Sequence, residues 1–339
     1  MLAPFGWSAV LTQWQFAPIV SASVAIAAGF YGWGVVRVAR RHPARPWPAW
    51  RTAMFGAGLA VVVIATQSGI GVYDDLLFWD HMVQHLMLIM VAPPLLIAGQ
   101  PITLLLHASR NPLHTWTKRV LRSKVASFLT WPVFGCAAYA TAIAAAHLTG
   151  VANLVERNQT LHNTEHAVFL IVGYLFFLPI IGHEPIRWKL SYPVRFVILV
   201  LIMPVDTFTG LVLGYGSASS PGIPSGPRPA WAPNPVQDLH LGGAVMWIGG
   251  DCLMFALMML VFLMWSTDER AGSQGRGWFE RARRENLATL IGSHAVAAGG
   301  AAAPVALAEG RGGIDDDEHL AAYNAYLARL NQNPPDRAR

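Results

Sequence analysis

Long runs of apolar residues recur along the chain and are separated by shorter polar segments. Each run is about 20 residues long, which is the length that an α-helix needs to cross a bilayer. We predict seven such spans, at residues 16–38, 54–72, 79–99, 128–148, 162–182, 194–216 and 239–265. The pattern therefore predicts an all-α integral membrane protein that folds as a seven-transmembrane-helix bundle.

Prolines interrupt two of these spans. Pro93 and Pro94 lie in the third span, and Pro204 lies in the sixth. Because proline removes a helical hydrogen bond, we expect a break or kink at each place. Residues 100–106 are then expected to form an interfacial continuation of the third span.

Lysine and arginine residues alternate between the two sides of the predicted bundle. They gather in the first, third and fifth loops and in the C-terminal segment, whereas only Arg157 and Arg228 fall in loops on the other side. Because basic loops are retained in the cytoplasm, this asymmetry predicts an external N-terminus and a cytoplasmic C-terminus. The expected location is the cell membrane, in which the chain is multi-pass.

Composition agrees with a membrane location. Hydrophobic residues make up 54% and charged residues 13% of the chain, and the mean hydropathy is +0.39. The net charge of +5 follows from the topology, so we expect membrane lipid and no nucleic acid as a partner. The two cysteines, Cys136 and Cys252, lie in different spans and form no CxxC pair, which argues against a thiolate metal clip.

The domain organisation follows from the same pattern. Residues 1–266 are predicted to form the seven-span membrane domain, and residues 267–339 a cytoplasmic tail. Within the tail, residues 299–313 are rich in Ala and Gly, as in a flexible linker. Residues 315–330 have the spacing of a short amphipathic helix with an acidic first turn. We expect this helix to bind a protein partner or the membrane surface.

Six of the 12 histidines gather at the predicted outer ends of the spans. They are His81 and His85 in the third span, His147 in the fourth, His162 and His166 in the fifth, and His240 in the seventh. Residues four apart share a helical face, so two of these spans present a histidine pair. Polar groups in a membrane are costly, and the gathering therefore indicates a functional site. The alternative is that the rings bind headgroups, water or neighbouring helices.

A metal ion takes only a few ligands, so six histidines exceed one coordination shell. Histidines four apart can chelate from a single helix. We therefore predict that His81, His85, His162 and His166 hold one ion directly. His147 is an alternative ligand that packing could bring in.

Two carboxylates lie deeper in the predicted spans. Asp251 follows His240 by eleven residues, which places both on one helical face. Asp206 lies in the middle of the sixth span. A carboxylate at this depth needs a proton or a partner. Either His240 and Asp251 lead an ion or proton inwards, with Asp206 further along, or each carboxyl is protonated and bonds to the backbone.

Further acidic residues lie near the histidines. Asp74, Asp75 and Asp80 precede His81 and could attract cations, although acidic residues are also simply tolerated in outer loops. Glu165 lies between two of the histidines and is a candidate general base.

Three segments carry a family resemblance: HMVQHLMLIMVAPPLLIAGQP, LHNTEHAVFLIVGYLFFLPIIG and DLHLGGAVMWIGGD. They resemble the CtaG family of multi-spanning cytochrome c oxidase assembly factors, over approximately residues 54–265. The resemblance implies a role in assembling haem–copper oxidases, through copper supply, with cytochrome c oxidase subunits as partners. The histidines that match the family are His81, His85, His162, His166 and His240.

The sequence leaves different classes of function open. In the first, a non-enzymatic assembly factor binds copper ion at the outer histidines and passes it to the oxidase. In the second, an intramembrane zinc-dependent hydrolase uses three histidines and a carboxylate. In the third, two histidines on facing helices ligate the iron of a b-type haem.

Overall fold

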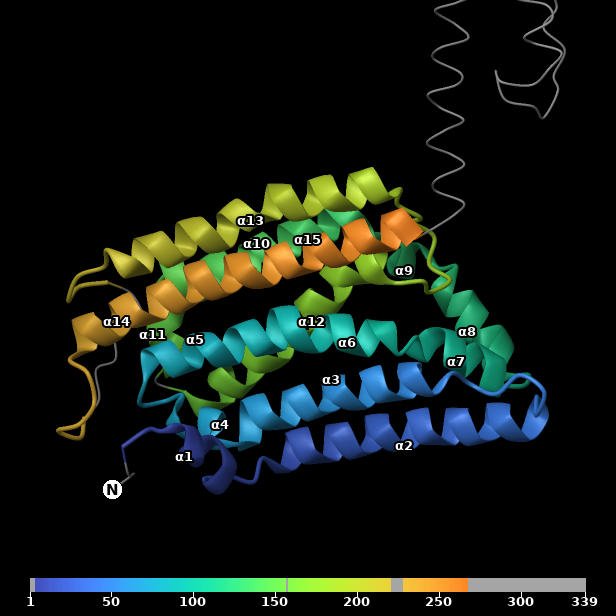
Figure 1. Cartoon of the computed structure of the whole chain (residues 1–339), viewed down its shortest axis with the longest axis horizontal. Helices are drawn as coiled ribbons and strands as arrows, with labels where there is room; N and C mark the ends of the chain where they lie inside the picture. Colours follow the sequence, from blue (N-terminus) through green and yellow to red (C-terminus); the bar gives the residue numbers. More distant parts are fainter. Residues whose placement is uncertain (1–3, 157, 221–227, 268–339) are drawn as a thin grey trace, which may run out of the picture. The chain divides into compact units, whose positions relative to one another are not determined.

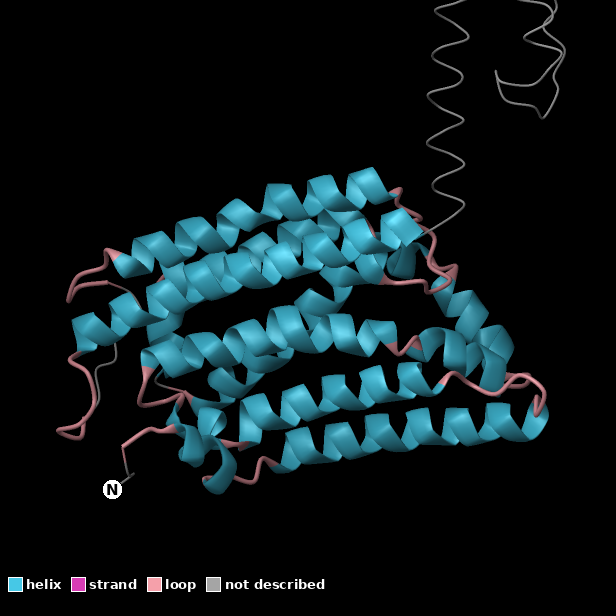
Figure 2. Ribbon diagram, viewed as in Figure 1, coloured by secondary structure: helices cyan, strands magenta, loops and turns pink. Residues whose placement is uncertain are grey.

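The computed structural model describes residues 4–156, 158–220 and 228–267. Every regular element in these ranges is a helix, and they contain no strand (Figure 2). The all-α prediction is therefore confirmed for this part of the chain. Residues up to Leu263 form one compact unit. The predicted tail, with its linker and amphipathic helix, lies outside the described residues.

Six helical segments are long and apolar enough to cross a membrane. They are α2 (Pro18–Arg41), α3 (Ala49–Gln67) with α4 (Gly69–Tyr73), α5 through α7 (Phe78–Ala108), α12 (Gln159–Ile181), α13 (Tyr192–Gly214), and α14 (Pro235–Ala244) through α15 (Gly250–Thr267). The predicted fourth span is the apolar helix α10 (Pro132–Leu148), whose 17 residues make it shorter than the others. The chain thus has the helices of a multi-pass membrane protein, and the count of seven stays a prediction.

The third span is divided into shorter helices. α5 (Phe78–Leu86) passes into a π-helical turn, η1 (Met87–Val91), before α6 (Ala92–Ala98) begins. Pro93 and Pro94 lie in the first turn of α6. Proline has no backbone N–H, so carbonyl groups of the preceding turn lose their usual helical hydrogen bonds, and this turn can widen into the π-helical form of η1. The predicted interruption is confirmed here, whereas α13 stays helical through Pro204.

The predicted continuation of the third span is also a helix, α7 (Pro101–Ala108). Gln100 turns the chain between α6 and α7 with a left-handed φ of 51°, which is uncommon outside glycine. Four short helices complete the described part: α1 (Trp7–Thr12), α8 (Leu113–Leu121), α9 (Lys124–Leu129) and α11 (Val151–Glu156).

The third span lies at the centre of the packing. α6 contacts α3 and α12, while α5 contacts α14. Ile89 in η1 and Phe177 in α12 are completely buried in the main core. α2 contacts α3 and α7 and leaves large apolar side chains such as Phe30 exposed, as expected for a helix that faces lipid.

Glycines allow α13 to approach α14 and the π-helical turn that follows it, η2 (Val245–Gly249). A Cβ atom placed on Gly210 of α13 would lie 2.7 Å from the backbone nitrogen of Trp247 and 2.8 Å from the carbonyl oxygen of Gly243. Small residues at such positions let helix backbones meet inside a membrane, where packing rather than water expulsion drives association.

The two ends of the bundle differ in chemistry (Figure 1). α4, α11 and the start of α5 lie at one end, and α7, α8 and α9 lie at the other. The first, here called the histidine end, carries His81, His85, His147, His162 and His166. The second, here called the basic end, contains the segments 42–48, 109–131 and 182–191 with their lysines and arginines.

Candidate metal centre

Three helices bring five histidines together at the histidine end. α5 carries His81 and His85, α12 carries His162 and His166, and the last turn of α10 carries His147. The ring centroids of His81 and His85 are 4.0 Å apart, those of His81 and His162 are 5.1 Å apart, and those of His162 and His166 are 4.5 Å apart. The four-residue spacing sets each pair on one face, and the contacts of the His81 ring with the rings of His162 and His166 show that the two faces meet.

His147 orients His85 through its ring nitrogens. Nδ1 of His147 is 2.9 Å from the carbonyl oxygen of Ile143, so this nitrogen carries a proton and donates it. Nε2 of His147 can then accept, and it lies 3.1 Å from Nδ1 of His85. The network therefore assigns the proton of a neutral His85 ring to Nδ1, which leaves a lone pair on Nε2. His147 thus presents His85 to the cluster, as outer partners of metal-binding histidines do.

Glu165 faces the lone pair of His85. Its Oε2 atom is 3.4 Å from Nε2 of His85 and 3.9 Å from Nε2 of His81. With His85 in the tautomer assigned above, both Nε2 and Oε2 are hydrogen-bond acceptors. Two acceptors repel each other at this distance unless a cation, either a proton or a metal ion, lies between or beside them.

Asp74 contributes a second carboxylate next to α12. Its Oδ2 atom lies 3.3 Å from Nε2 of His162 and accepts a hydrogen bond of 2.7 Å from the amide nitrogen of Gln84. The same amide nitrogen of Gln84 donates to the carbonyl oxygen of Ala65 at 2.9 Å. Gln84 is fully buried and lies between the two histidines of α5 in sequence, so it fixes the position of Asp74 relative to them.

These donors form two overlapping sets. The first set is Asp74, His81, His162 and His166, and the second set is His81, His85 and Glu165. Within each set, one ligand atom per residue lies within 4.8 Å of the others. Atoms bound at about 2.0–2.2 Å from a tetrahedral zinc ion lie roughly 3.3–3.6 Å apart, so the side chains of either set would have to move closer by about 1 Å to reach coordination distance.

Buried polar atoms at this end lack hydrogen-bond partners in the described part of the chain. They include Nε2 of His85 and His166 and Oε2 of Glu165. The ion pairs of Asp74 and Glu165 are with histidines, and no Lys or Arg pairs with either carboxylate among the described residues. Unpartnered buried acceptors are costly, and a cation would satisfy several of them at once. The donor set therefore fits a metal ion.

Asp238 anchors the start of α5 from a distant helix. Its two carboxylate oxygens accept hydrogen bonds from the backbone nitrogens of Phe78 at 2.9 Å and Trp79 at 3.1 Å. Arg228 pairs with the same carboxylate and donates to the carbonyl oxygen of Leu76 at 2.7 Å. A negative charge at a helix N-terminus is favourable, and this one ties α14 to the helix that carries His81 and His85.

The structure does not bring every predicted site residue into this group. His240 is exposed, and its Nε2 atom is 2.9 Å from the carbonyl oxygen of Gly216. Asp251 accepts a hydrogen bond of 2.9 Å from the hydroxyl of Thr207. Asp206 is fully buried and accepts from the hydroxyl of Tyr139 at 3.1 Å. The expected inward line from His240 to Asp251 therefore starts outside the five-histidine group, because His240 lies on the outward face of α14.

Sequence reasoning missed part of the site. Asp74 was expected only to attract cations, whereas its carboxylate lies among the rings. The roles of Gln84 and Asp238 were not recognised. The only local signal was the presence of polar residues in the otherwise apolar segments VQHL and DLHLGG. In both segments a role was assigned to the histidine and none to the neighbouring Gln84 or Asp238.

The comparison with known families agrees with this arrangement. Residues 29–268 match the family model described as cytochrome c oxidase caa3 assembly factor, Caa3_CtaG. The chain belongs to this family. The matched range contains both donor sets, together with Gln84, His147 and Asp238, so the resemblance found in the sequence is confirmed.

Curated relatives come from mycobacteria. Uncharacterized proteins of Mycobacterium bovis and Mycobacterium tuberculosis are each 29% identical over 275 residues, which is 77% of this chain and 40% of theirs. A third, from Mycobacterium leprae, is 28% identical over 266 residues, or 76% of this chain and 40% of its own length. The chain thus spans 40% of the length of these relatives. No solved structure matches it.

Proposed function

We propose that this chain is a non-enzymatic membrane assembly factor for cytochrome c oxidase that binds copper at the histidine end and supplies it to an oxidase subunit. Membership of the caa3 assembly factor family supports the pathway. One observation carries the metal-binding part of the proposal: two hydrogen-bond acceptors, Nε2 of His85 and Oε2 of Glu165, lie 3.4 Å apart. Nε2 of His85 is an acceptor because the contact with His147 keeps the proton of the His85 ring on Nδ1. In this proposal copper is cargo, which the chain holds and then releases.

The two donor sets suggest how binding and release could be combined. Asp74, His81, His162 and His166 offer three nitrogens and one oxygen, a set that suits Cu(II) or Zn(II) better than the softer Cu(I). His81 also belongs to the set with His85 and Glu165. An ion could therefore move between the sets by exchanging ligands around His81, without being released into the apolar core.

The ring packing favours a small ion over haem. His81 and His85 are in contact with each other, and the His85 ring also lies 4.4 Å from the ring of Phe169. A porphyrin needs a flat slot beyond Nε2 of each axial histidine, and Nε2 of His85 instead faces Oε2 of Glu165 at 3.4 Å. These contacts argue against the haem alternative.

A zinc-dependent hydrolase remains the second candidate, because of one observation. Glu165 lies beside two histidines that could hold zinc, which is where a general base would receive a proton from a metal-bound water. This candidate requires zinc in the purified protein and a substrate that reaches the histidine end. The assembly-factor proposal requires copper and an effect on the oxidase.

The test is the metal content of the full-length protein, purified in detergent, together with oxidase assembly in cells. His81→Ala and His166→Ala each remove a ring from the first donor set and should reduce bound copper. They should also reduce the copper content and activity of the oxidase, while the abundance of the chain stays unchanged. His42→Ala and His107→Ala, at exposed positions of the basic end, serve as matched controls and should have no effect.

The outcomes separate the alternatives. Zinc at one equivalent, without copper and without any effect on the oxidase, would favour the hydrolase. Full copper retention in the His81→Ala, His85→Ala double variant would overturn the proposed site. Equal effects of the histidine-end variants and the controls would indicate general packing roles instead.

A further inference from the structure

A separate pocket lies at the basic end, far from the five histidines of the histidine end. Its volume is ≈ 360 Å³, and it lies between α7, α8, α9 and the segment that follows α12. Three basic side chains, the hydroxyl of a serine and several apolar side chains line it, among them Lys118, Arg122, Arg187, Ser127, Leu106 and Ile186. A ligand that complements this lining has an anionic group, to pair with the basic side chains, and an apolar part, to contact the apolar side chains.

Residues 184–188 form the side of the pocket opposite α8, and hydrogen bonds hold this segment in place. Glu184 is buried, and its carboxylate accepts hydrogen bonds from the backbone nitrogens of Ile102 at 3.0 Å and Thr103 at 2.8 Å, at the start of α7. Burial raises the pKa of Glu184, and the hydrogen bonds from Thr103 and Ile102 oppose this rise. The indole nitrogen of Trp188 donates to the carbonyl oxygen of Ser127 at 2.7 Å. The segment between Glu184 and Trp188 is therefore anchored at both ends.

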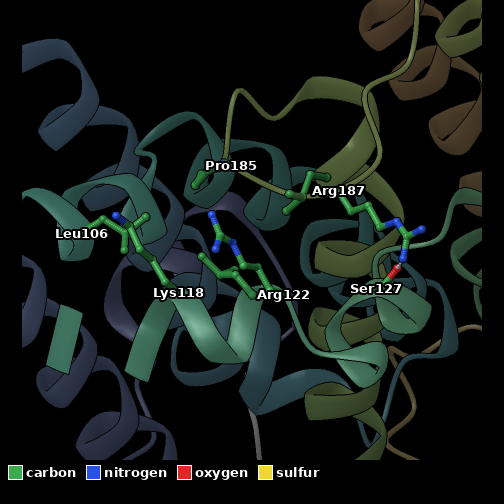
Figure 3. Close-up of a pocket in the computed structure, with 8 residues that line it drawn as sticks. Leu106, Lys118, Arg122, Ser127, Pro185 and Arg187 are labelled. Atoms are coloured by element: carbon green, nitrogen blue, oxygen red, sulfur yellow. Dashed lines mark hydrogen bonds between the residues drawn. The ribbon is translucent and has the colours of Figure 1, made fainter. Parts of the chain in front are cut away.

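The basic side chains reach different parts of the pocket (Figure 3). Lys118 and Arg122 lie four residues apart at the end of α8, and the guanidinium of Arg122 lies near Pro185, whereas the side chain of Lys118 extends towards Leu106. The guanidinium of Arg187 turns to the hydroxyl of Ser127, 3.4 Å away, at the side of the pocket. Among the residues that the structure describes, Lys118 and Arg122 have no carboxylate within ion-pair distance, and the nearby Glu184 is occupied at α7. Two like charges on one face repel unless an anion lies between them.

The surrounding surface is typical of the headgroup level of a membrane. On α8 and α9, Trp116 is 59%, Val125 68% and Phe128 53% exposed. Tryptophan and other amphipathic or apolar side chains on short helices with Lys and Arg are characteristic of segments that lie in the membrane interface. The pocket is therefore at the depth where lipid phosphates are found.

We propose that this pocket binds the phosphate of an anionic phospholipid, with Lys118 and Arg122 as the main contacts, Arg187 and Ser127 at the side, and the apolar walls against the upper part of the acyl chains. Basic pockets between membrane helices are known to take such headgroups. The ligand would tie α8 and α9 to the segment 184–188 and so brace the basic end of the bundle.

The test uses the full-length protein, purified in a neutral detergent and titrated with phosphatidylglycerol, phosphatidylcholine or inorganic phosphate. Binding is read by native mass spectrometry and by the shift of the thermal unfolding midpoint. We expect phosphatidylglycerol to bind and to raise the midpoint, and phosphatidylcholine and inorganic phosphate to do neither. In the Lys118→Gln, Arg122→Gln double variant the affinity for phosphatidylglycerol should fall roughly 30-fold, since each basic residue near a lipid surface contributes about a factor of five.

The matched control is Arg119→Gln, Lys124→Gln. It removes the same charge from α8 and the first residue of α9, next to the test pair in sequence, but neither residue lines the pocket. The control should bind phosphatidylglycerol like the parent chain. An equal loss in the two double variants would overturn the proposal, because binding would then follow overall charge. Equally tight binding of inorganic phosphate would also overturn it, because the site would then recognise free phosphate and not a lipid.

Discussion

Nδ1 of His85 and Nε2 of His147 lie 3.1 Å apart, although the two residues are 62 positions apart in the chain. His147 in turn donates to the carbonyl oxygen of Ile143. Because this chain of contacts leaves Nε2 of His85 as the free acceptor, we propose that His147 orients His85 in the proposed metal centre and is not itself a ligand.

The first prediction concerns His147→Phe, which keeps a ring against Phe169 but removes the acceptor for His85. Copper affinity should fall about 10–100-fold, while the bound copper at saturation stays the same. Competition with a chelator measures both quantities. His240→Phe, at an exposed position, should leave the affinity unchanged. Complete loss of binding in His147→Phe at saturating copper would show that His147 is a direct ligand.

The second prediction concerns the buried pair of Arg228 and Asp238. Asp238→Asn keeps the shape but removes the charge that faces the start of α5, and it leaves Arg228 without its partner. Breaking a buried pair in this way typically costs about 3–5 kcal/mol in the free energy of unfolding. Unfolding in mixed micelles measures the loss. Asp75→Asn is the control, since that carboxylate is 59% exposed, and equal stability of the two variants would contradict the anchoring role.

The third prediction concerns the close contact of α13 with α14 and η2. Gly210→Ala places a Cβ atom 2.7 Å from the backbone of Trp247, so one helix must move. We expect the free energy of unfolding to fall by about 1–3 kcal/mol. Gly29→Ala in α2 meets no atom within 4 Å and should be neutral or slightly stabilising, since alanine favours helix. Unfolding of the two variants in the same micelles gives the comparison, and equal stability would refute the packing argument.

The fourth prediction concerns topology. Reporter fusions after Arg45 and after Arg119 should report a cytoplasmic location, and a fusion near Ser220 an external one, because basic loops are retained in the cytoplasm. The histidine end would then face outwards. A cytoplasmic reading near Ser220 would place the metal centre at the inner face and reverse the direction of copper entry.

Local patterns in the sequence were sufficient to predict the positions of most of the long helices. Apolar runs located the long helices within a few residues, since the backbone must satisfy its own hydrogen bonds in a membrane. Pro93 and Pro94 located the break in the third span, which the structure resolves as the π-helical turn η1. α10 is the exception: it begins at Pro132 and not at residue 128, because α9 and its C-terminal turn occupy the preceding residues.

The histidine pairs were also visible in the sequence, because residues four apart share a helical face whatever surrounds the helix. What only the tertiary structure decided is how each helix is rotated towards its neighbours. That rotation depends on side-chain packing between residues far apart in the chain, as in the contact of Asp238 with Phe78 across 160 positions. It turned His240 outwards, joined His147 to His85, and placed Asp74 and Glu165 among the rings. Periodicity determines which residues share a face, and packing between the faces determines which atoms can meet around an ion.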